Sequence, residues 1–356
     1  MKVKKVLVMA GGTGGHVFPA LAIAKALEKE GAEILWLGTR GRMEEMLVPK
    51  YGYNIRYIDV KGVRRNGLKT LLKAPFMVAR AIVQARAVIK EFKPDVVLGM
   101  GGYASGPGGA AAFLSGIPVV LHEQNAAAGM TNKLLFKIAS KVMLGFPGAF
   151  AGEKVSVVGN PVRDSIIALH EKTRDFTHTP VRISIIGGSL GAGALNELVP
   201  LALKKFTDDS ILVTHQCGKG NSDKVKALYE SASFKVEATD FIDNMDALYA
   251  NTDLIICRAG ALTVAETSTA GIPAIFVPLP TAVDDHQTKN ASVLAKAGAA
   301  FVCKQSSLSA DSLYDLVKSL VDDREKLAFM SAKAYECAIT DATERAVKII
   351  ESVVKD

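Results

Sequence analysis

Both halves of the chain open in the same way, with a short apolar strand that leads into a glycine-rich turn and then a helix. In the first half the strand Val6–Ala10 meets GGTGGH at 11–16, and in the second Ile183–Ile186 meets GGSLGA at 187–192. Strand and helix patterns go on alternating in both halves, and several strands are continuous apolar runs, as expected for parallel sheets covered on both faces. We therefore predict an α/β fold with two Rossmann-like, doubly wound parallel-sheet domains that share one cleft.

The 356 residues are enough for two domains of ordinary size, and GNPVR at 159–163 is the expected hinge. We expect an N-terminal domain at 1–162, a C-terminal domain at 163–340, and a helix at 341–356 that returns to the first domain. Because Pro75 interrupts the helical pattern of Leu68–Phe92, we expect a helical hairpin or a broken helix there. Strands are predicted at 4–9, 33–37, 54–60, 95–98, 118–121, 156–158, 181–186, 211–215, 234–238, 254–257, 274–277 and 300–302.

Several classes of protein are disfavoured by what the sequence lacks. Neither glycine turn completes Gly-x-Gly-x-x-Gly, and no acid ends the second strand of either half, which argues against NAD. There is no Gly-x-x-x-x-Gly-Lys-Ser/Thr loop for ATP, no Asp-x-Asp and no cysteine pair at zinc spacing, so we expect no cofactor and no metal. The uncharged stretch Val96–Leu121 holds seven Gly and two Pro, which disfavours a membrane-spanning helix.

The net charge of +7 is unevenly distributed. Residues 1–160 carry 22 Lys and Arg against 10 Asp and Glu, whereas residues 161–356 carry 21 against 26. Residues 60–90 hold eight basic side chains and no acidic one, interleaved with apolar residues, which favours an anionic membrane surface as partner. A core helix with solvated cations remains the alternative. Nucleic acid is disfavoured, because one Trp and 6% aromatic residues provide little for bases to stack on.

A few residues stand where chemistry is expected, at the carboxyl ends of strands. The glycine turns place backbone N–H groups at helix N-termini, where they can bind phosphate, although glycines also permit close packing. His16 closes the first turn and favours a catalytic role, while His122 fits a base or a buried hydrogen-bonding residue equally well. Glu266, expected in the first turn of a helix, fits a ribose-binding carboxylate or a helix-dipole partner.

Seven motifs together resemble, in order, those of the MurG family of bacterial UDP-N-acetylglucosamine:undecaprenyl-pyrophosphoryl-N-acetylmuramyl-pentapeptide N-acetylglucosaminyltransferases. The resemblance spans essentially the whole chain and implies a GT-B fold, in which two Rossmann-like domains face a cleft. It further implies that the C-terminal domain binds the UDP-sugar donor and that the N-terminal domain faces the acceptor and the membrane. The motifs are GGTGGH at 11–16, GGYASGPGG at 101–109, HEQN at 122–125, GNPVR at 159–163, GGSLGA at 187–192, FIDNM at 241–245 and GALTVAE at 260–266. One position departs from the pattern, because Leu190 stands where many relatives carry Gln, which weakens any claim that this side chain touches phosphate.

The resemblance implies a metal-independent, inverting transfer of N-acetylglucosamine (GlcNAc) from UDP-GlcNAc to the 4-hydroxyl of a lipid-linked muramyl-pentapeptide, the product being a peptidoglycan precursor. It implies that Glu266 holds the ribose, Ile242 meets uracil, and Ser189 and Arg163 contact the diphosphate. It further implies a nucleotide site along Ala261, Leu262, Thr263, Val264 and Ala265, and donor-sugar contacts from Thr13, Gly14, Gly15, Asn125 and Gln287. The family's basic N-terminal surface implies peripheral attachment at the cytoplasmic face of the bacterial cell membrane.

The acceptor hydroxyl also needs a base, for which His16 is our first choice and Glu123 our second. A diacylglycerol glycosyltransferase of the same fold would share the donor, the basic face and a lipid acceptor. A nucleotide-sugar epimerase would need acid and base residues but no membrane face. A sensor that binds UDP-GlcNAc without turnover is a third alternative.

Overall fold

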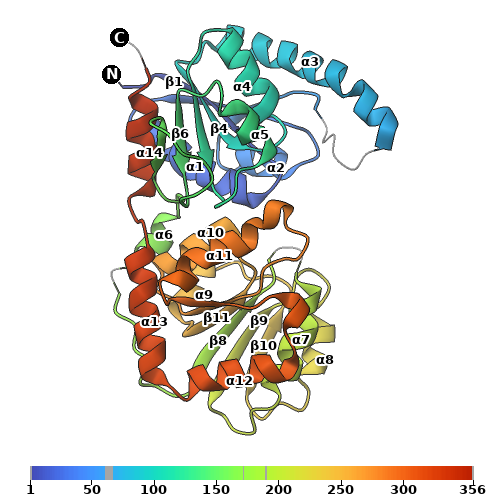
Figure 1. The fold of residues 1–356 in the computed structure, drawn as a ribbon, viewed down its shortest axis with the longest axis vertical. Helices are drawn as coiled ribbons and strands as arrows, with labels where there is room; N and C mark the ends of the chain where they lie inside the picture. Colours follow the sequence, from blue (N-terminus) through green and yellow to red (C-terminus); the bar gives the residue numbers. More distant parts are fainter. Residues whose placement is uncertain (1, 61–66, 171, 189–190, 355–356) are drawn as a thin grey trace. The chain divides into compact units, whose positions relative to one another are not determined.

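The computed structural model of the protein describes residues 2–60, 67–170, 172–188 and 191–354. The chain divides into two compact units (Figure 1). The first unit comprises residues 1–162 together with 340–356, and the second comprises 163–339. Each unit is a parallel sheet with helices on both faces, so the predicted fold class of two Rossmann-like domains is confirmed.

The first unit contains a seven-stranded sheet in the order β3-β2-β1-β4-β5-β6-β7. Its strands are β1 (Lys5–Ala10), β2 (Glu33–Gly38), β3 (Asn54–Tyr57), β4 (Val96–Gly101), β5 (Val119–Glu123), β6 (Lys141–Leu144) and β7 (Val155–Val157). Its helices are α1 (Gly14–Lys29), α2 (Met43–Lys50), α3 (Gly67–Phe92), α4 (Ser105–Leu114), α5 (Met130–Leu135) and α14 (Ala342–Glu351).

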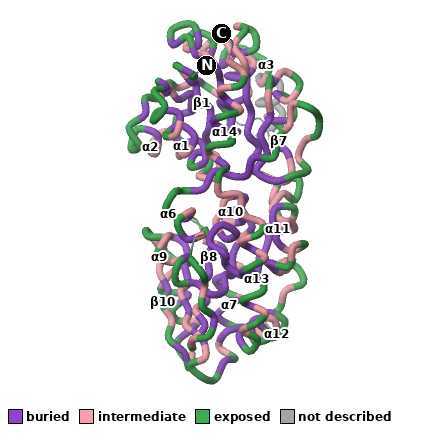
Figure 2. Tube along the Cα trace, turned by 90° about the vertical axis from the view of Figure 1, so that its left-hand side faces the viewer, coloured by how far each residue is buried: buried purple, intermediate pink, exposed green. Residues whose placement is uncertain are grey.

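Alternate residues of β1 enter two separate cores of the first unit. Val6, Val8 and Ala10 pack in the core that contains α1 and α14, whereas Leu7 and Met9 pack in the core that contains α3 and α4. Because β1 is covered on both faces, every residue from Val6 to Ala10 is fully buried, and β1 lies among the purple stretches of Figure 2. The red helix α14, from the end of the chain, therefore lies beside α1 (Figure 1).

The second unit contains a six-stranded sheet in the order β10-β9-β8-β11-β12-β13. Its strands are β8 (Val181–Ile186), β9 (Ile211–Gln216), β10 (Lys235–Thr239), β11 (Leu254–Cys257), β12 (Ala274–Phe276) and β13 (Ala300–Val302). Its helices are α6 (Asp164–Ile167), α7 (Gly193–Leu203), α8 (Ser222–Leu228), α9 (Met245–Ala250), α10 (Ala261–Thr269), α11 (His286–Lys296), α12 (Ala310–Val321) and α13 (Arg324–Cys337). Val181, Ile183 and Ile185 of β8 share one core with α7 and α12.

Two elements differ from the sequence prediction. The segment expected as a hairpin or broken helix is one helix, α3, which continues through Pro75. A single proline removes only one hydrogen bond from a helix, and Ala81, Ala85 and Ile89 bury the following turns against the sheet. Strand β6 was not predicted at all, because its four residues begin with Lys141 and follow a helical pattern without a turn residue.

Candidate functional site

Each sheet reverses its strand order at one place, and several of the predicted site residues follow the strands on either side of it. In the first unit the reversal lies between β1 and β4, and in the second between β8 and β11. In open α/β sheets, ligands bind at such switch points, outside the carboxyl ends of the strands. The loops that leave these four strands are the glycine turns after β1, β4 and β8 and the Arg258–Gly260 turn after β11.

The turn after β1 places His16 in the first turn of α1. Thr13 is the N-cap residue in an extended conformation, and Gly14, Gly15 and His16 are the first three helical residues. The His16 Nδ1 lies 2.9 Å from the carbonyl oxygen of Gly11. A carbonyl only accepts hydrogen bonds, so in the neutral form of the ring Nδ1 carries the proton and Nε2 keeps its lone pair. This tautomer is the one a base needs if it acts through Nε2.

A buried carboxylate that the sequence analysis did not single out holds the same turn. Glu44, in the first turn of α2, accepts the backbone N–H of Gly12 at 2.8 Å. It also accepts the N–H and the hydroxyl of Thr39, at 3.1 and 2.7 Å. Part of this glycine turn therefore binds a side-chain carboxylate, not an external phosphate. The only sequence signal is an acidic residue at the start of a helix that follows β2.

The turn after β4 packs directly on the turn after β1. A Cβ atom on Gly102, which has φ of +91°, would lie 2.7 Å from the carbonyl oxygen of Gly11. The neighbouring Gly101 lies against the ring of His16, because a Cβ there would be 2.9 Å from Nε2. The Ser105 hydroxyl links β1 and β4, because it lies 3.0 Å from the Met9 carbonyl oxygen and 2.7 Å from that of Gly101 and can donate to both. Position 102 therefore requires glycine, because the positive φ disfavours other residues and a side chain would clash with the Gly11 backbone.

Glu123, at the end of β5, organises the loop that follows it. Its Oε1 accepts the N–H and the side-chain amide of Asn125, at 3.1 and 3.2 Å. Its Oε2 accepts the N–H of Gly129 and the side-chain amide of Asn132, both at 2.9 Å. Because the side chain is buried and both oxygens are engaged, these contacts favour a positioning role over that of a base.

His122 is fully buried beside these residues. Its Nε2 lies 3.0 Å from the carbonyl oxygen of Gly159, and burial lowers the pKa of the ring to about 4. The ring is therefore neutral at physiological pH, with the proton on Nε2. Of the two readings of His122 in the sequence, these contacts favour the buried hydrogen-bonding residue.

In the second unit, the glycine turn after β8 packs on the end of β9. The Gly188 N–H donates to Oε1 of Gln216 at 3.0 Å, and the Gln216 amide donates back to the Gly188 carbonyl at 2.9 Å. A Cβ on Gly191, which has φ of +74°, would clash with the carbonyl oxygen of Cys217. Ser189, which the resemblance predicts as a diphosphate contact, and its neighbour Leu190 lie outside the described residues.

Glu266 is the centre of a charged cluster in the second unit. Its Oε2 accepts the hydroxyl of Tyr249 at 3.0 Å, and its Oε1 lies 3.5 Å from the guanidinium of Arg163. Arg163 also lies 3.6 Å from Asp246 Oδ1. Burial raises the pKa of Glu266, while Arg163 and the Tyr249 hydroxyl act in the opposite direction. The cluster therefore offers a largely buried carboxylate, with its side chain 16% exposed, to hydroxyls and an arginine to phosphate.

The position of Glu266 in its helix corrects the sequence prediction. Helix α10 begins at Ala261, directly after the extended N-cap residue Gly260, and no acidic residue lies in its first turn. Glu266 is the sixth helical residue, about 8 Å along the axis from the helix start. Interaction with the helix dipole falls off within the first turn, so it does not explain this carboxylate. The first five residues of α10 are Ala261, Leu262, Thr263, Val264 and Ala265.

Gln287 lies in the first turn of α11 and links two loops at the same edge of the sheet. Its Oε1 accepts the N–H of Ala259 at 3.2 Å and that of Leu279 at 2.9 Å. Ile242, in the segment between β10 and α9, is half-buried beside the exposed Phe241. These positions bring Gln287, Arg163 and Glu266 to one unit, whereas His16, Glu123 and Asn125 belong to the other.

Two kinds of feature are absent from the described residues, namely a metal-binding cluster and a membrane-spanning helix. No cluster of three or more His, Cys, Asp or Glu in that part of the chain is arranged to hold a metal ion. No described helix is long and apolar enough to cross a membrane.

Comparisons with known proteins agree with this architecture. The Glycosyltransferase family 28 N-terminal domain matches residues 6–144, and the Glycosyltransferase family 28 C-terminal domain matches residues 182–352. A UDP-N-acetylglucosamine–N-acetylmuramyl-(pentapeptide) pyrophosphoryl-undecaprenol N-acetylglucosamine transferase of Shewanella sp. (strain MR-4) is 53% identical, over 97% of this chain and 96% of its own length. The transferase of the same name from Shewanella oneidensis is also 53% identical over 349 residues.

Solved structures give the same result. The crystal structure of Acinetobacter baumannii MurG superposes with a TM-score of 0.86 at 43% identity, covering 98% of this chain and all of that one. A UDP-GlcNAc 2-epimerase from Neisseria meningitidis has a TM-score of 0.70 at 16% identity, covering 98% of this chain and all of that one, which shows the fold alone.

The fold, the two switch points and the matched domains define a glycosyltransferase built from two Rossmann-like domains. Within that class, the chain belongs to the family of UDP-N-acetylglucosamine–N-acetylmuramyl-(pentapeptide) pyrophosphoryl-undecaprenol N-acetylglucosamine transferases, which includes MurG. The resemblance predicted from the seven motifs is thereby confirmed.

Proposed function

We propose that the chain transfers GlcNAc from UDP-GlcNAc to the 4-hydroxyl of a lipid-linked muramyl-pentapeptide, with inversion at the anomeric carbon and without a catalytic metal ion. The observation that carries this proposal is the 53% identity, over 97% of the chain, to transferases with that name. The Glu266 cluster and the His16 turn supply the chemical groups that such a reaction needs.

The second unit holds the donor nucleotide in this proposal. Glu266 accepts the ribose hydroxyls, Ile242 contacts uracil through its backbone, and the start of α10 lines the nucleotide site. Arg163 leaves its pairs with Glu266 and Asp246 to meet the diphosphate, since both pairs are long and its side chain is 43% exposed. An arginine fork suits the two phosphates, whose negative charge grows as UDP departs. Ser189 and the amides of the glycine turn complete the diphosphate contacts, and Gln287 contacts the donor sugar.

The first unit holds the acceptor and its base. His16 removes the proton of the attacking hydroxyl through Nε2, because the Gly11 carbonyl keeps the proton on Nδ1. Thr13, Gly14 and Gly15 contact the donor sugar from the same turn, and Asn125 does so from the loop that Glu123 organises. Glu123 is a positioning residue in this scheme.

We further propose peripheral attachment of the first unit to the cytoplasmic face of the cell membrane. Exposed apolar side chains gather on three consecutive helices of that unit, at Phe76 and Val83 of α3, Phe113 and Leu114 of α4, and Met130 and Leu134 of α5. Basic residues of the 60–90 region accompany them, although Lys61, Arg64 and Arg65 lie outside the described residues and the side chains of Lys69 and Lys73 are not described.

The transfer reaction is tested with radiolabelled UDP-GlcNAc and a lipid-linked muramyl-pentapeptide analogue. Formation of the disaccharide with release of UDP supports the proposal. A product formed with diacylglycerol and not with the muramyl lipid, release of an epimer, or binding of UDP-GlcNAc without turnover would each replace it with another function.

His16→Ala tests the base, because it removes Nε2 and leaves the second unit untouched. We expect turnover to fall by at least about a hundredfold, with UDP affinity unchanged. Glu123→Gln is the companion variant, since a positioning residue tolerates it better than a base does. Unchanged turnover in His16→Ala would remove this residue from the mechanism.

Sedimentation with liposomes tests membrane attachment. Binding should increase with the fraction of anionic lipid and decrease with salt, because attraction between surface charges is screened over about 10 Å at 0.1 M salt. Equal binding to neutral and anionic vesicles at low salt would contradict the proposal.

A further inference from the structure

Three helices of the second unit meet at the Glu266 cluster, because α6 packs against both α9 and α10. Arg163 is the N-cap residue of α6, Tyr249 belongs to the last turn of α9, and Glu266 lies in the middle of α10. Tyr249 is 1% exposed, whereas the Glu266 side chain is 16% exposed. A ligand can therefore reach Glu266 but not Tyr249, which can act on a ligand only through its neighbour.

The Tyr249 hydroxyl fixes one oxygen of the Glu266 carboxylate. It donates to Oε2 at 3.0 Å. Burial, together with the charge of Glu266, raises the pKa of Tyr249 well above its ordinary value of 10, so the hydroxyl stays protonated and remains a donor. The other oxygen, Oε1, lies 3.5 Å from Arg163, which the proposed function moves to the diphosphate. Oε1 thereby becomes available to a ribose hydroxyl while Oε2 stays held.

Arg174, between α6 and β8, holds the two helices that carry this pair. Its guanidinium donates to the carbonyl oxygens of Tyr249, Thr252 and Ala270, at 2.6, 2.5 and 2.6 Å. Thr252 follows α9 and Ala270 is the C-cap residue of α10, so one side chain binds the C-terminal ends of both helices. A cation at this end satisfies carbonyls that the helix leaves unpaired and complements the helix dipole. Arg174 therefore links α9 directly to α10.

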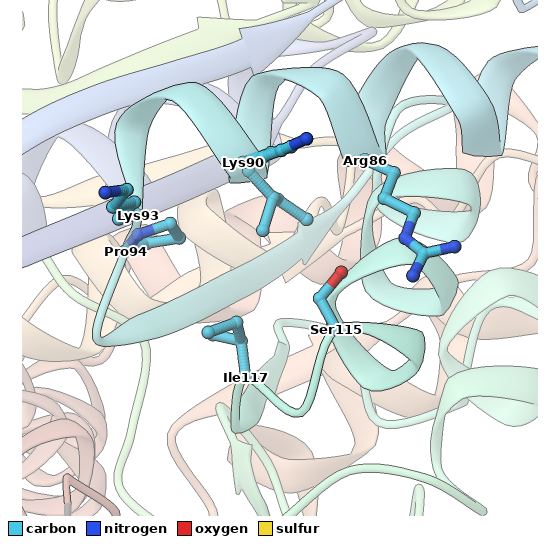
Figure 3. A pocket seen from close by; sticks show the side chains of 7 residues that line it. Arg86, Lys90, Lys93, Pro94, Ser115 and Ile117 are labelled. Carbon is cyan, nitrogen blue, oxygen red and sulfur yellow. The ribbon is translucent and has the colours of Figure 1, made fainter.

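This link lies at the edge of the sheet opposite the one at which ligands bind. Helices between parallel strands run back towards the amino-terminal edge, so the C-terminal ends of α9 and α10 lie there. A cavity of about 350 Å³ beside Arg174 and Arg182 lies at this edge of the second unit. The first unit has a cavity of about 550 Å³ at the corresponding edge, and Figure 3 shows its lining from Arg86 on α3 to Ile117 before β5. Arg174 therefore supports the nucleotide site without contacting a nucleotide.

We propose that Tyr249 is a positioning residue of the nucleotide site, whose hydroxyl orients the Glu266 carboxylate for the ribose. This inference rests on the proposed role of Glu266 as the ribose-binding carboxylate. Helix α9 begins three residues after Ile242, the proposed uracil contact, and Asn244 caps its start by accepting the Ala247 N–H at 2.9 Å. One helix therefore begins beside the uracil contact and supports the ribose contact near its other end. Tyr249 sets the spacing at which base and ribose are recognised together.

The test compares UDP with 2′,3′-dideoxy-UDP, which has the same base and diphosphate but no ribose hydroxyls for Glu266 to bind. Calorimetry on the full chain gives the dissociation constant of each nucleotide, and their ratio measures what the hydroxyls contribute. In the parent, UDP should bind at least about tenfold more tightly, because a site that hydrogen-bonds a hydroxyl discriminates against an analogue without it. In Glu266→Ala the two nucleotides should bind within about twofold of each other.

Tyr249→Phe removes the hydroxyl and keeps the buried ring. We expect it to lower the preference for UDP at least about fourfold by weakening UDP alone, with the affinity for 2′,3′-dideoxy-UDP within about twofold of the parent. Retained affinity for the dideoxy nucleotide also shows that the variant is folded. Tyr229→Phe is the matched control, because it removes another buried hydroxyl of the second unit, whose partner at 3.2 Å is His215 Nδ1. It should change the preference less than about twofold.

Equal weakening of both nucleotides in Tyr249→Phe would make Tyr249 a general structural residue and overturn the inference. Equal effects of Tyr249→Phe and Tyr229→Phe would do the same, since any buried hydroxyl would then suffice. An unchanged preference in Tyr249→Phe, where Glu266→Ala has lost it, would overturn the positioning role and leave the ribose contact of Glu266 standing. An unchanged preference in Glu266→Ala would instead contradict the proposed function of that residue, and the inference with it.

Discussion

Two buried carboxylates hold the loops on which the chemistry of the first unit depends. Glu44 fixes the turn that carries Thr13 and His16, and Glu123 fixes the loop that carries Asn125. A carboxylate is suited to this task, because one side chain can accept several N–H groups and charge-assisted hydrogen bonds are stronger than neutral ones. Neither carboxylate needs to touch substrate to affect the rate, since displacement by about 1 Å in a site can reduce turnover substantially.

Glu44→Gln tests this positioning role. Glutamine replaces one carboxylate oxygen by an NH₂ group, which cannot accept a hydrogen bond. This group would face at least one of three donors, which are the N–H groups of Gly12 and Thr39 and the Thr39 hydroxyl. We expect a loss of about 1–3 kcal/mol in unfolding free energy and a decrease in turnover of at least about tenfold. UDP affinity should not change, because the nucleotide site is assigned to the other unit. Steady-state kinetics and UDP calorimetry provide the two measurements.

The matched control for Glu44 is its neighbour. Glu45→Gln changes an equal charge in the same helix turn, but its contacts are with Arg40 and the Gly41 N–H near the surface. It should leave turnover within about twofold of the parent. A stability loss in Glu44→Gln with turnover unchanged would make Glu44 a purely structural residue.

His122 makes the stability of the first unit depend on pH. Burial lowers its pKa to about 4 from an ordinary 6.5, so between these values the unfolded chain binds a proton that the folded chain does not. The unfolding free energy should therefore fall as pH decreases from 6.5 to 4, by up to about 3 kcal/mol. Fluorescence of Trp36, the single Trp and a buried residue of this unit, follows the transition.

In His122→Asn the unfolding free energy should decrease less steeply as pH falls. The difference in slope should be about 1.4 kcal/mol per pH unit, which corresponds to one proton. His215, whose pKa burial also lowers to about 4, lies in the second unit. His215→Asn should therefore leave the pH dependence of the Trp36 transition unaltered. The same pH dependence in the parent and in His122→Asn would show that other groups cause it.

The sequence could predict those parts of the site in which the interacting groups lie close together along the chain. Motif positions were predictable, because glycine turns, His16 and Glu123 each follow a recognisable strand. Glu44 was not, because its partner Gly12 lies 32 residues away and no local pattern connects them. The pairing of Arg163 with Glu266 spans 103 residues and is equally invisible before the chain folds.

At the scale of elements, the strong local patterns were the predictable ones. Strands β8, β11 and β13 have the predicted bounds, because each is a short apolar run beside a turn. Strand β6 and the continuity of α3 through Pro75 were missed, because packing against neighbouring elements decides them. Glu266 was expected in the first turn of its helix and is the sixth residue of α10, which begins at Ala261.

Gly191→Ala tests how tightly the glycine turn of the second unit packs. The added Cβ would meet the Cys217 carbonyl oxygen, which is backbone and cannot move aside, and φ of +74° disfavours alanine. We expect a loss of about 3 kcal/mol in unfolding free energy and weaker UDP binding. Gly220→Ala is the control, since its φ is +76° but nothing lies within 4 Å of the added atom, and it should cost about 1 kcal/mol. Equal losses would show that backbone conformation alone matters.

At the scale of the whole molecule, the two units have separate cores, and the first is completed by both ends of the chain. Helix α14 contributes Ala346, Val347 and Ile350 to the core that contains Val6 and Val8 of β1. The two-domain fold class was predictable, because the strand and helix alternation occurs twice along the chain. Because the last helix belongs to the first unit, a substitution in its buried face should destabilise that unit and leave the second unchanged.

Ile350→Ala should destabilise the first unit alone. Ile350 is fully buried, so truncation leaves a cavity and should cost about 2–5 kcal/mol of unfolding free energy. Ile349, the half-buried neighbour, provides the control, and Ile349→Ala should cost clearly less. Trp36 fluorescence reports the first unit, so its transition should shift to lower denaturant in Ile350→Ala, while UDP affinity, a property assigned to the second unit, stays constant. If the two variants shifted the Trp36 transition equally, or if UDP affinity fell with it, the separate-core description of the chain would be wrong.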